Sequence, residues 1–135
     1  AKVLIGGKRP SGFNKGYFFE PTVFDDVDDN FTIMKTEPFG PLVPILSFKS
    51  FDEVVERANN NDLGLCSYIY TNSMEKAHKA SELMETGCVA VNTPTVAIAE
   101  APFGGIKQTG YGREGGSMAI KDYLNIKYTH LGLKT

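Results

Sequence analysis

Between residues 42 and 92 the sequence alternates apolar runs with amphipathic stretches, and this order constrains the fold more than any other feature. The apolar runs are "LVPILSF" at 42–48, "LCSYIYT" at 65–71 and "CVAVN" at 88–92. Two helical patterns separate them, one over 51–60 and one from Asn72 to about Glu85. Strand–helix–strand connections cross over right-handed and build parallel sheets, whose strands are covered on both faces. The sequence therefore predicts an α/β fold with two βαβ units in a parallel sheet.

The ends of both helices carry recognisable signals. Ser50 followed three residues later by Glu53 is a capping box, in which each residue satisfies backbone N–H groups of the first turn. Asn72 with Glu75 predicts the start of the second helix. Gly87 stands where a glycine commonly ends a helix in the left-handed conformation.

The flanks are less regular. We predict a strand over 17–24, which Pro21 confines to a sheet edge or a bulge, and a connection over 25–36. A long loop over 93–113 leads to a helix near 116–124. A final strand over 126–133 has side chains on two faces and invites pairing with another chain.

Composition narrows the class of protein. The chain has 135 residues, 41% of them apolar and 22% charged, as expected of a globular domain with a core. Its net charge is −2 and it has no run of basic residues, so nucleic acid is not an expected partner. No apolar run approaches the roughly 18–20 residues that span a bilayer, so no membrane partner is expected. The start, "AKVLIGGKRP", is unlike a signal peptide and resembles the middle of a strand, which predicts a cytoplasmic fragment.

One glycine-rich stretch, "GYGREG" at 110–115, matches the letters of a dinucleotide-binding loop. That loop needs a strand before it, a helix directly after it and an acidic residue about 20 positions on. The preceding "APFGGIKQT" is not a strand, and Asp122 comes too soon. The interpretation is a tight loop whose glycines allow positive φ and close packing.

The two cysteines, Cys66 and Cys88, do not form a metal-binding spacing, and His78 and His130 lie in unrelated contexts. No metal site is expected. Both cysteines lie in apolar strand patterns, which predicts buried, inert thiols rather than nucleophiles. His78 is expected in solvent, and His130 could lie at a subunit contact.

Four motifs carry a resemblance that runs through the whole chain. They are "GYFFEPTVF", "EPFGPLVPIL", "GCVAVN" and "APFGGIKQTGYGREGG". In this order and spacing they resemble the C-terminal part of an NAD(P)-dependent aldehyde dehydrogenase. The tail "KDYLNIKYTHLGL" is similar to the semialdehyde branch, which includes succinate-semialdehyde dehydrogenase.

The resemblance implies a chemistry and a division of the chain. In the family, a cysteine thiolate attacks the aldehyde, hydride passes to the nicotinamide, and activated water hydrolyses the thioester. The nucleophile, the main base and the domain for NAD or NADP all precede the part present here, so the fragment is expected to be inactive alone. Residues 1–125 would belong to the catalytic domain and 126–135 to the oligomerisation strand and tail. The whole enzyme is expected to be a dimer or tetramer acting on an aldehyde or semialdehyde.

For the cofactor, the resemblance implies Glu37 and Phe39. An ionised carboxylate at Glu37 would accept hydrogen bonds from the two hydroxyls of the nicotinamide ribose. Phe39 would pack near the nicotinamide ring. From the residues alone, a solvated carboxylate and a core aromatic are the alternatives.

For the substrate, the resemblance implies Phe103 in the tunnel beside the missing cysteine, with a core position as the alternative. The loop "TPTVAIAEA" at 93–101 would form a wall of the pocket. Ala97 and Ile98 stand where succinate-semialdehyde enzymes have a serine that holds the distal carboxylate, which favours a less polar or differently anchored aldehyde. Asn92, at the end of its strand, is interpreted as a residue that satisfies loop backbone.

Glu114 resembles a glutamate proposed to relay protons toward the deacylating water. The alternative is a carboxylate that stabilises the start of a helix. Arg113 and Lys107 are interpreted as structural donors that anchor the loop.

Two other functions remain open. The chain could be an interaction module that keeps the fold, lacks catalysis and pairs with full-length subunits. It could also be an unrelated α/β domain with a glycine-rich ligand loop, although the elements flanking the loop argue against this.

Overall fold

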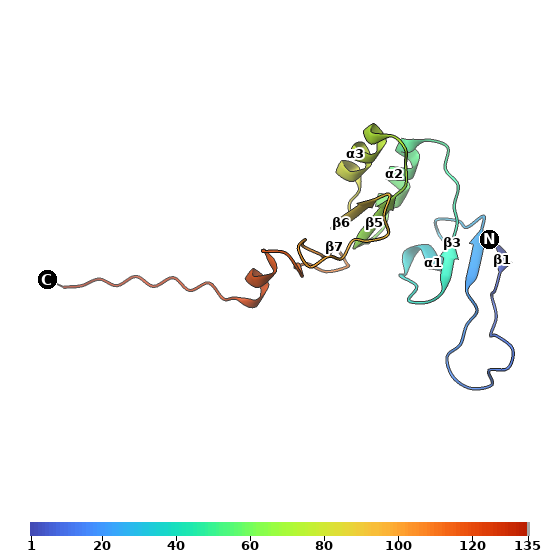
Figure 1. Cartoon of the computed structure of the whole chain (residues 1–135), viewed down its shortest axis with the longest axis horizontal. Helices are drawn as coiled ribbons and strands as arrows, with labels where there is room; N and C mark the ends of the chain where they lie inside the picture. Colours follow the sequence, from blue (N-terminus) through green and yellow to red (C-terminus); the bar gives the residue numbers. More distant parts are fainter. Residues whose placement is uncertain (135) are drawn as a thin grey trace. The chain divides into compact units, whose positions relative to one another are not determined.

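A computed structural model of the chain describes residues 1–134 and divides into two compact units (Figure 1). The first unit is formed by Ala1–Leu63, and the second begins at Gly64.

The first unit contains a three-stranded sheet of β1 (Lys2–Ile5), β2 (Thr22–Asp25) and β3 (Leu42–Pro44), in that order. β1 and β2 are antiparallel, with an irregularity between Val3 and Ile5, and β2 and β3 are parallel. Thr22 is fully buried, and its Oγ1 accepts a hydrogen bond from Gly7 N at 2.7 Å and donates one to Glu20 O at 2.7 Å. A threonine hydroxyl thus satisfies backbone groups where β2 begins.

The strands of this unit are shorter than predicted. β2 begins only at Thr22, because Pro21 has no N–H to give to a ladder. Of the two predicted settings, a sheet edge or a bulge, the edge is wrong because β2 is central; the ladder of β2 with β1 does carry an irregularity, and Pro21 lies just outside the strand. β3 ends at Pro44, and the next residue, Ile45, still donates its N–H to Phe24 O at 2.8 Å. The connection at 25–36 contains a short helix that the sequence analysis missed, α1 (Thr32–Lys35).

The predicted capping box is present at the start of α2 (Phe51–Asn59). Ser50 Oγ accepts the backbone N–H of Glu53 at 3.1 Å. The carboxylate of Glu53 reaches back to the N–H of Lys49 at 2.8 Å, one residue earlier than in the standard motif.

The second unit confirms one of the two predicted βαβ units. β5 (Cys66–Ile69) runs parallel to β6 (Cys88–Val91), and α3 (Met74–Leu83) connects them. Ala77 and Ala80 of α3 and Ala90 of β6 are buried. The other predicted unit is wrong, because β3 joins the sheet of β1 and β2 and does not pair with β5. An alternating pattern predicts strands and helices but does not decide which strands become neighbours.

Both ends of α3 differ from the prediction. Its N-cap is Ser73, whose Oγ accepts the N–H of Lys76 at 3.3 Å, and the helix ends at Leu83. Met84 caps it in an extended conformation, so Gly87 is not the glycine that ends the helix. Gly87 has a different reason to be a glycine, because a Cβ there would overlap the carbonyl oxygen of Gly104.

The rest of the second unit is mostly irregular. A two-stranded pairing joins β4 (Leu63–Gly64) to β7 (Ile106–Lys107), a strand that lies within the predicted loop. Instead of a helix over 116–124 there is a 3₁₀ helix, Ala119–Tyr123, because Gly115 and Gly116 both have positive φ.

The predicted final strand, 126–133, is neither helix nor strand in the single chain, and its side chains are exposed. Its pairing with another subunit stays a prediction, and Thr135 lies outside the described residues. Across residues 1–134, the helices are all too short or too polar to cross a bilayer.

Candidate functional site

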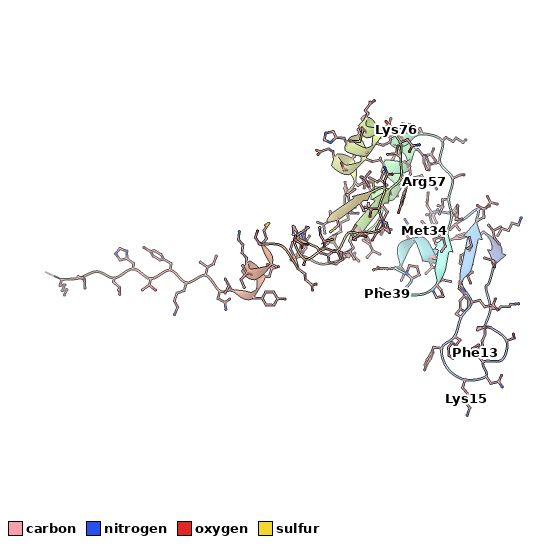
Figure 2. The ribbon with its side chains drawn as sticks, in the orientation of Figure 1. Phe13, Lys15, Met34, Phe39, Arg57 and Lys76 are labelled. Carbon is pink, nitrogen blue, oxygen red and sulfur yellow. The ribbon has the colours of Figure 1, made fainter. Side chains whose placement is uncertain are left out.

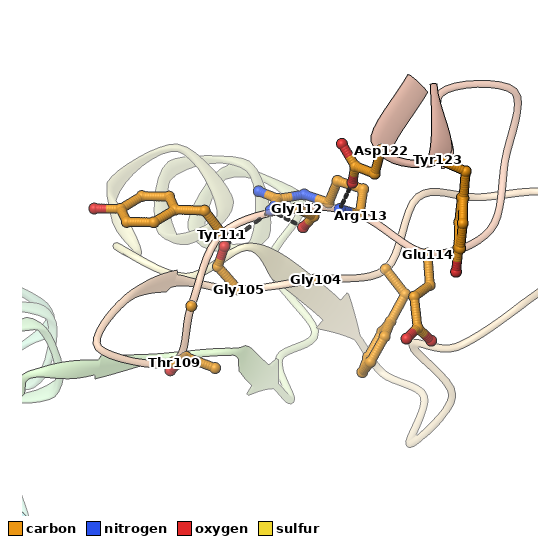
Figure 3. Close-up of a pocket in the computed structure, with 11 residues that line it drawn as sticks. Gly104, Gly105, Thr109, Tyr111, Gly112, Arg113, Glu114, Asp122 and Tyr123 are labelled. Atoms are coloured by element: carbon orange, nitrogen blue, oxygen red, sulfur yellow. Dashed lines mark hydrogen bonds between the residues drawn. The ribbon is translucent and has the colours of Figure 1, made fainter. Parts of the chain in front are cut away.

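A pocket of about 340 Å³ opens within the second unit, on the glycine-rich loop (Figure 3). Residues 103–105, 109–114 and 122–123 line it. The pocket therefore lies on the segment that carried the most specific motif of the sequence analysis.

Two predicted site residues meet at this pocket, Phe103 and Glu114. They form an isolated antiparallel bridge, with Phe103 N donating to Glu114 O at 2.7 Å and Glu114 N donating to Phe103 O at 2.8 Å. Phe103 is half-buried and the Glu114 side chain is exposed. Because the bridge uses only backbone groups, the carboxylate of Glu114 remains available for other contacts.

Arg113 holds the glycine-rich loop in place through hydrogen bonds to neighbouring backbone and side-chain groups. Its Nη1 donates to the carbonyls of Gly105 at 2.8 Å and Gly112 at 2.7 Å, while its backbone N–H donates to Asp122 Oδ2 at 2.8 Å (Figure 3). A guanidinium presents several donors in a fixed plane, which suits a pair of carbonyls. These contacts support the prediction that Arg113 anchors the loop. Asp122 was missed as its partner, because no local sequence signal joins two residues nine positions apart in irregular structure.

The geometry answers whether "GYGREG" binds a dinucleotide. Gly110, Gly112 and Gly115 all have positive φ, as a tight loop requires. However, the N–H groups of Gly110, Arg113 and Glu114 donate to acceptors inside the protein. A phosphate needs free N–H donors and a positive field, whereas this loop faces the carboxylate of Asp122. The structure therefore confirms the predicted tight loop, whose glycines adopt positive φ and whose N–H groups at Gly110, Arg113 and Glu114 bond within the protein.

The loop that carries Ala97 and Ile98 is attached to the same glycines. The N–H of Gly116 donates to Ala99 O at 2.8 Å, and a Cβ at Gly115 would stand 2.7 Å from the oxygen of Ala101. Ala97 and Ile98 are exposed, with Ile98 at 51%. The predicted pocket wall is thus joined directly to the loop that bears Glu114.

Asn92 has the structural role that was predicted. It has a positive φ of 55°, and its side-chain amide pairs with the backbone of Thr71, with both hydrogen bonds at 2.9 Å. Asparagine tolerates this conformation better than most residues.

Glu37 and Phe39 belong to the first unit, in an irregular segment ahead of β3. Gly40 N donates to Pro38 O at 2.7 Å, which bends the chain and leaves the ring of Phe39 94% exposed (Figure 2). Glu37 is also exposed, and within residues 1–134 its carboxylate has no hydrogen bond or ion pair. The carboxylate of Glu37 and the ring of Phe39 are therefore both open to a ligand.

The cysteines are less buried than predicted. Cys66 and Cys88 are free and both are half-buried, because the short strands leave one side of the pair partly uncovered. Burial, and then the neighbouring Cys88, raise the pKa of the Cys66 thiol above its ordinary value. A raised pKa disfavours the thiolate and is consistent with a poor nucleophile at Cys66.

The remaining candidates have simple surroundings. Lys107 Nζ lies 2.6 Å from Glu85 Oε2, which supports its structural interpretation. His78 is exposed on α3, as predicted, and His130 Nδ1 lies 3.1 Å from the Tyr128 hydroxyl. The part of the chain that the structure describes contains no group of three or more histidine, cysteine or acidic side chains that could hold a metal.

Fold and site together define an α/β chain with small mixed sheets and a self-closed, glycine-rich loop. The model of the aldehyde dehydrogenase family matches residues 1–129. The chain belongs to the aldehyde dehydrogenase family.

Individual relatives agree with this membership. The mitochondrial succinate-semialdehyde dehydrogenase of Arabidopsis thaliana is 45% identical over 98% of this chain and 25% of its own length. The chloroplastic betaine aldehyde dehydrogenase of Beta vulgaris is 42% identical over 94% of this chain and 25% of its own. The NAD+ complex of an aldehyde dehydrogenase from Bacillus cereus has a TM-score of 0.89 and 44% identity over 98% of this chain and 27% of that one. The chain therefore spans about a quarter of the length of the relatives it matches.

Proposed function

We propose that this chain is the part of an NAD(P)-dependent aldehyde dehydrogenase that completes its active site, and that the whole enzyme oxidises an aldehyde or semialdehyde to the carboxylic acid through a cysteine thioester. The observation that carries the proposal is the family match over residues 1–129, almost the whole chain. The nucleophilic cysteine and the cofactor domain lie in the three quarters of the enzyme that this chain does not span. The chain alone is accordingly inactive.

In this proposal Glu37 and Phe39 hold the cofactor. When bound, NAD or NADP supplies the hydride acceptor. Glu37 accepts hydrogen bonds from the ribose hydroxyls, since its carboxylate has no other partner within the described residues. Phe39 packs on the nicotinamide side and excludes water there, because its exposed ring needs an apolar partner.

Phe103, Ala97 and Ile98 form the substrate wall. The side chains of Ala97 and Ile98 cannot hydrogen-bond a distal carboxylate, so the preferred aldehyde is less polar than succinate semialdehyde or is anchored elsewhere. Relatives named for succinate semialdehyde and for betaine aldehyde are almost equally similar to this chain. Overall sequence identity therefore does not distinguish between these substrates, and the proposal rests on the side chains of the substrate wall.

Glu114 acts as a proton relay toward the deacylating water. Its carboxylate is exposed, while its backbone is fixed by the bridge to Phe103. This arrangement holds a titratable group at a constant place beside the substrate wall.

The division of the chain is also part of the proposal. Residues 1–125 belong to the catalytic domain, and 126–135 form an oligomerisation strand with its tail. Ile126 is 101% exposed and Leu133 is 91% exposed, and apolar side chains this bare favour burial against a second subunit in a homodimer or homotetramer. The alternative, an interaction module without catalysis, uses the same segment.

The test measures reduced-cofactor formation by the whole protein that contains this chain. Substrates are succinate semialdehyde, longer semialdehydes, betaine aldehyde and simple aliphatic aldehydes, each with NAD and with NADP. We expect activity in the whole protein and none in the isolated chain. If no aldehyde gave reduced cofactor, the proposed dehydrogenase activity would be overturned and the interaction module would be favoured.

Matched variants assign the roles. Glu37→Gln should raise the KM for the cofactor by about tenfold, since a neutral amide accepts weaker hydrogen bonds than a carboxylate. Glu56→Gln, an exposed carboxylate on α2, is the control and should leave this KM unchanged. Glu114→Gln keeps the backbone bridge and removes only the titratable group, so it should change the pH profile of kcat. An unchanged profile would assign Glu114 a structural role.

A further inference from the structure

The two cysteines of the chain lie directly opposite each other in the second unit. In the parallel register of β5 and β6, Cys66 pairs with Cys88. Paired residues on neighbouring strands point to the same face, with the strands about 4.8 Å apart. A disulfide requires Cα atoms roughly 4.4–6.8 Å apart, so the backbone positions already suit one.

The two side chains also lie within electrostatic reach of each other, because the neighbouring Cys88, after burial, raises the pKa of the Cys66 thiol. Both thiols are free and half-buried, which leaves them accessible to a small reagent. Cys88 Sγ in addition lies 3.6 Å from the carbonyl oxygen of Gly104, the residue that follows Phe103.

We propose that Cys66 and Cys88 form a dithiol that a low-molecular-weight disulfide oxidises to a cross-strand disulfide. This modification site does not depend on the proposed dehydrogenase activity. It is distinct from the nucleophile of that reaction, which lies outside the chain.

The reaction proceeds by two thiol–disulfide exchanges. The Cys88 thiolate attacks one sulfur of the small disulfide, forms a mixed disulfide and releases the first small thiol. The Cys66 thiolate then attacks the Cys88 sulfur and releases the second. Two electrons pass from the protein sulfurs to the small disulfide, and the two protein thiol protons end on the released thiols. Burial raises the pKa of the Cys66 thiol, which disfavours Cys66 as the first attacker.

The bond would affect the candidate site through Gly104. It removes the Cys88 S–H that donates to the Gly104 carbonyl and ties β5 to β6 where both strands begin. Oxidation thus acts on the glycine-rich loop next to Phe103.

The experiment treats the protein with glutathione disulfide, blocks free thiols with N-ethylmaleimide at acidic pH and maps tryptic peptides without reduction. Trypsin separates the cysteines, because Lys76 and Lys79 lie between them, into peptides 58–76 and 80–107. We expect these two peptides to be linked to each other and to separate on reduction. This readout also works when other cysteines are present.

Two serine variants test the order of attack. Cys66→Ser should retain glutathione on Cys88, because the second exchange has no attacker. Cys88→Ser should react several-fold more slowly and leave most of Cys66 free. The wild-type map alone decides the proposal if a variant fails to fold. Free thiols at both positions, separate glutathione adducts on both, or links only between different chains would each overturn it.

Discussion

Close approaches of backbone to backbone at glycines gather in the second unit, while the first unit has one at Gly6 against Pro21; only in the first unit does an arginine join two segments through ion pairs among the described residues. A Cβ at Gly87 would overlap the Gly104 carbonyl, and one at Gly104 would overlap that of Gly112. In the first unit, Arg57 spans from α2 to the connection before α1. Its Nε lies 2.8 Å from Asp29 Oδ2.

The Arg57 bridge has further partners. Its Nη1 donates to Glu53 Oε1 at 3.1 Å and to the carbonyl of Ser47 at 2.8 Å. A close contact at a glycine requires that there is no Cβ, so any substitution that adds a side chain disrupts it. A contact between partly exposed charges weakens gradually and responds to salt and pH. The two regions should therefore respond differently to the same kinds of perturbation.

The largest expected effect is that of Gly87→Ala. The added methyl group has no space beside the Gly104 carbonyl, and overpacking of this kind costs about 3 kcal/mol. The loss in free energy of unfolding is measured by urea denaturation, with hydrogen exchange of amides in the second unit as the readout. Gly132→Ala is the control, because nothing lies within 4 Å of a Cβ at that position. Equal stability of the two variants would show that the backbone around Gly104 can shift to accommodate the added methyl group at little cost.

Replacing one arginine in each unit tests whether the two units differ in their dependence on salt. Arg113→Ala should destabilise the second unit by about 2 kcal/mol, because carbonyls of Gly105 and Gly112 lose a charged donor. Its effect should be similar at low and high salt, since these acceptors are neutral. Arg57→Ala should have a smaller effect that decreases further in about 1 M salt, where the Debye length is about 3 Å. Equal salt dependence in the two variants would remove the distinction.

The smallest expected effect is the pH dependence of the first unit. Hydrogen bonding from the backbone of Lys49, and then from Arg57, lowers the pKa of Glu53 below its ordinary value of 4.5. A carboxyl whose folded pKa is lowered stabilises the fold above the unfolded pKa and loses that contribution as pH falls through the folded value. The protection factors of the α2 amides, which correct for the intrinsic pH dependence of exchange, should therefore fall below about pH 4.5. Glu53→Gln should remove this dependence while keeping the Ser50 cap, and a persisting dependence would point to another acid.

Local signals in the sequence were sufficient for several elements. The Ser50–Glu53 cap predicted the start of α2, and the apolar runs at 65–71 and 88–92 predicted β5 and β6. The flanks of "GYGREG" were enough to reject a dinucleotide loop, and the polar character of Asn92 and Arg113 indicated backbone anchoring. Each of these depends on residues close together in the chain, where caps, periodicity and glycine conformations act.

Contacts between distant residues were decided by the tertiary structure. The pairing of β3 with β2, the approach of Gly87 to Gly104 and the meeting of Phe103 with Glu114 join segments far apart in sequence. So does the register that sets Cys66 opposite Cys88. The sequence by itself determined the start of α2, the strands β5 and β6 and the tight glycine loop, because these follow from short-range sterics and capping. Only the tertiary structure decided which of them touch, because strand pairing and close packing depend on all competing partners at once.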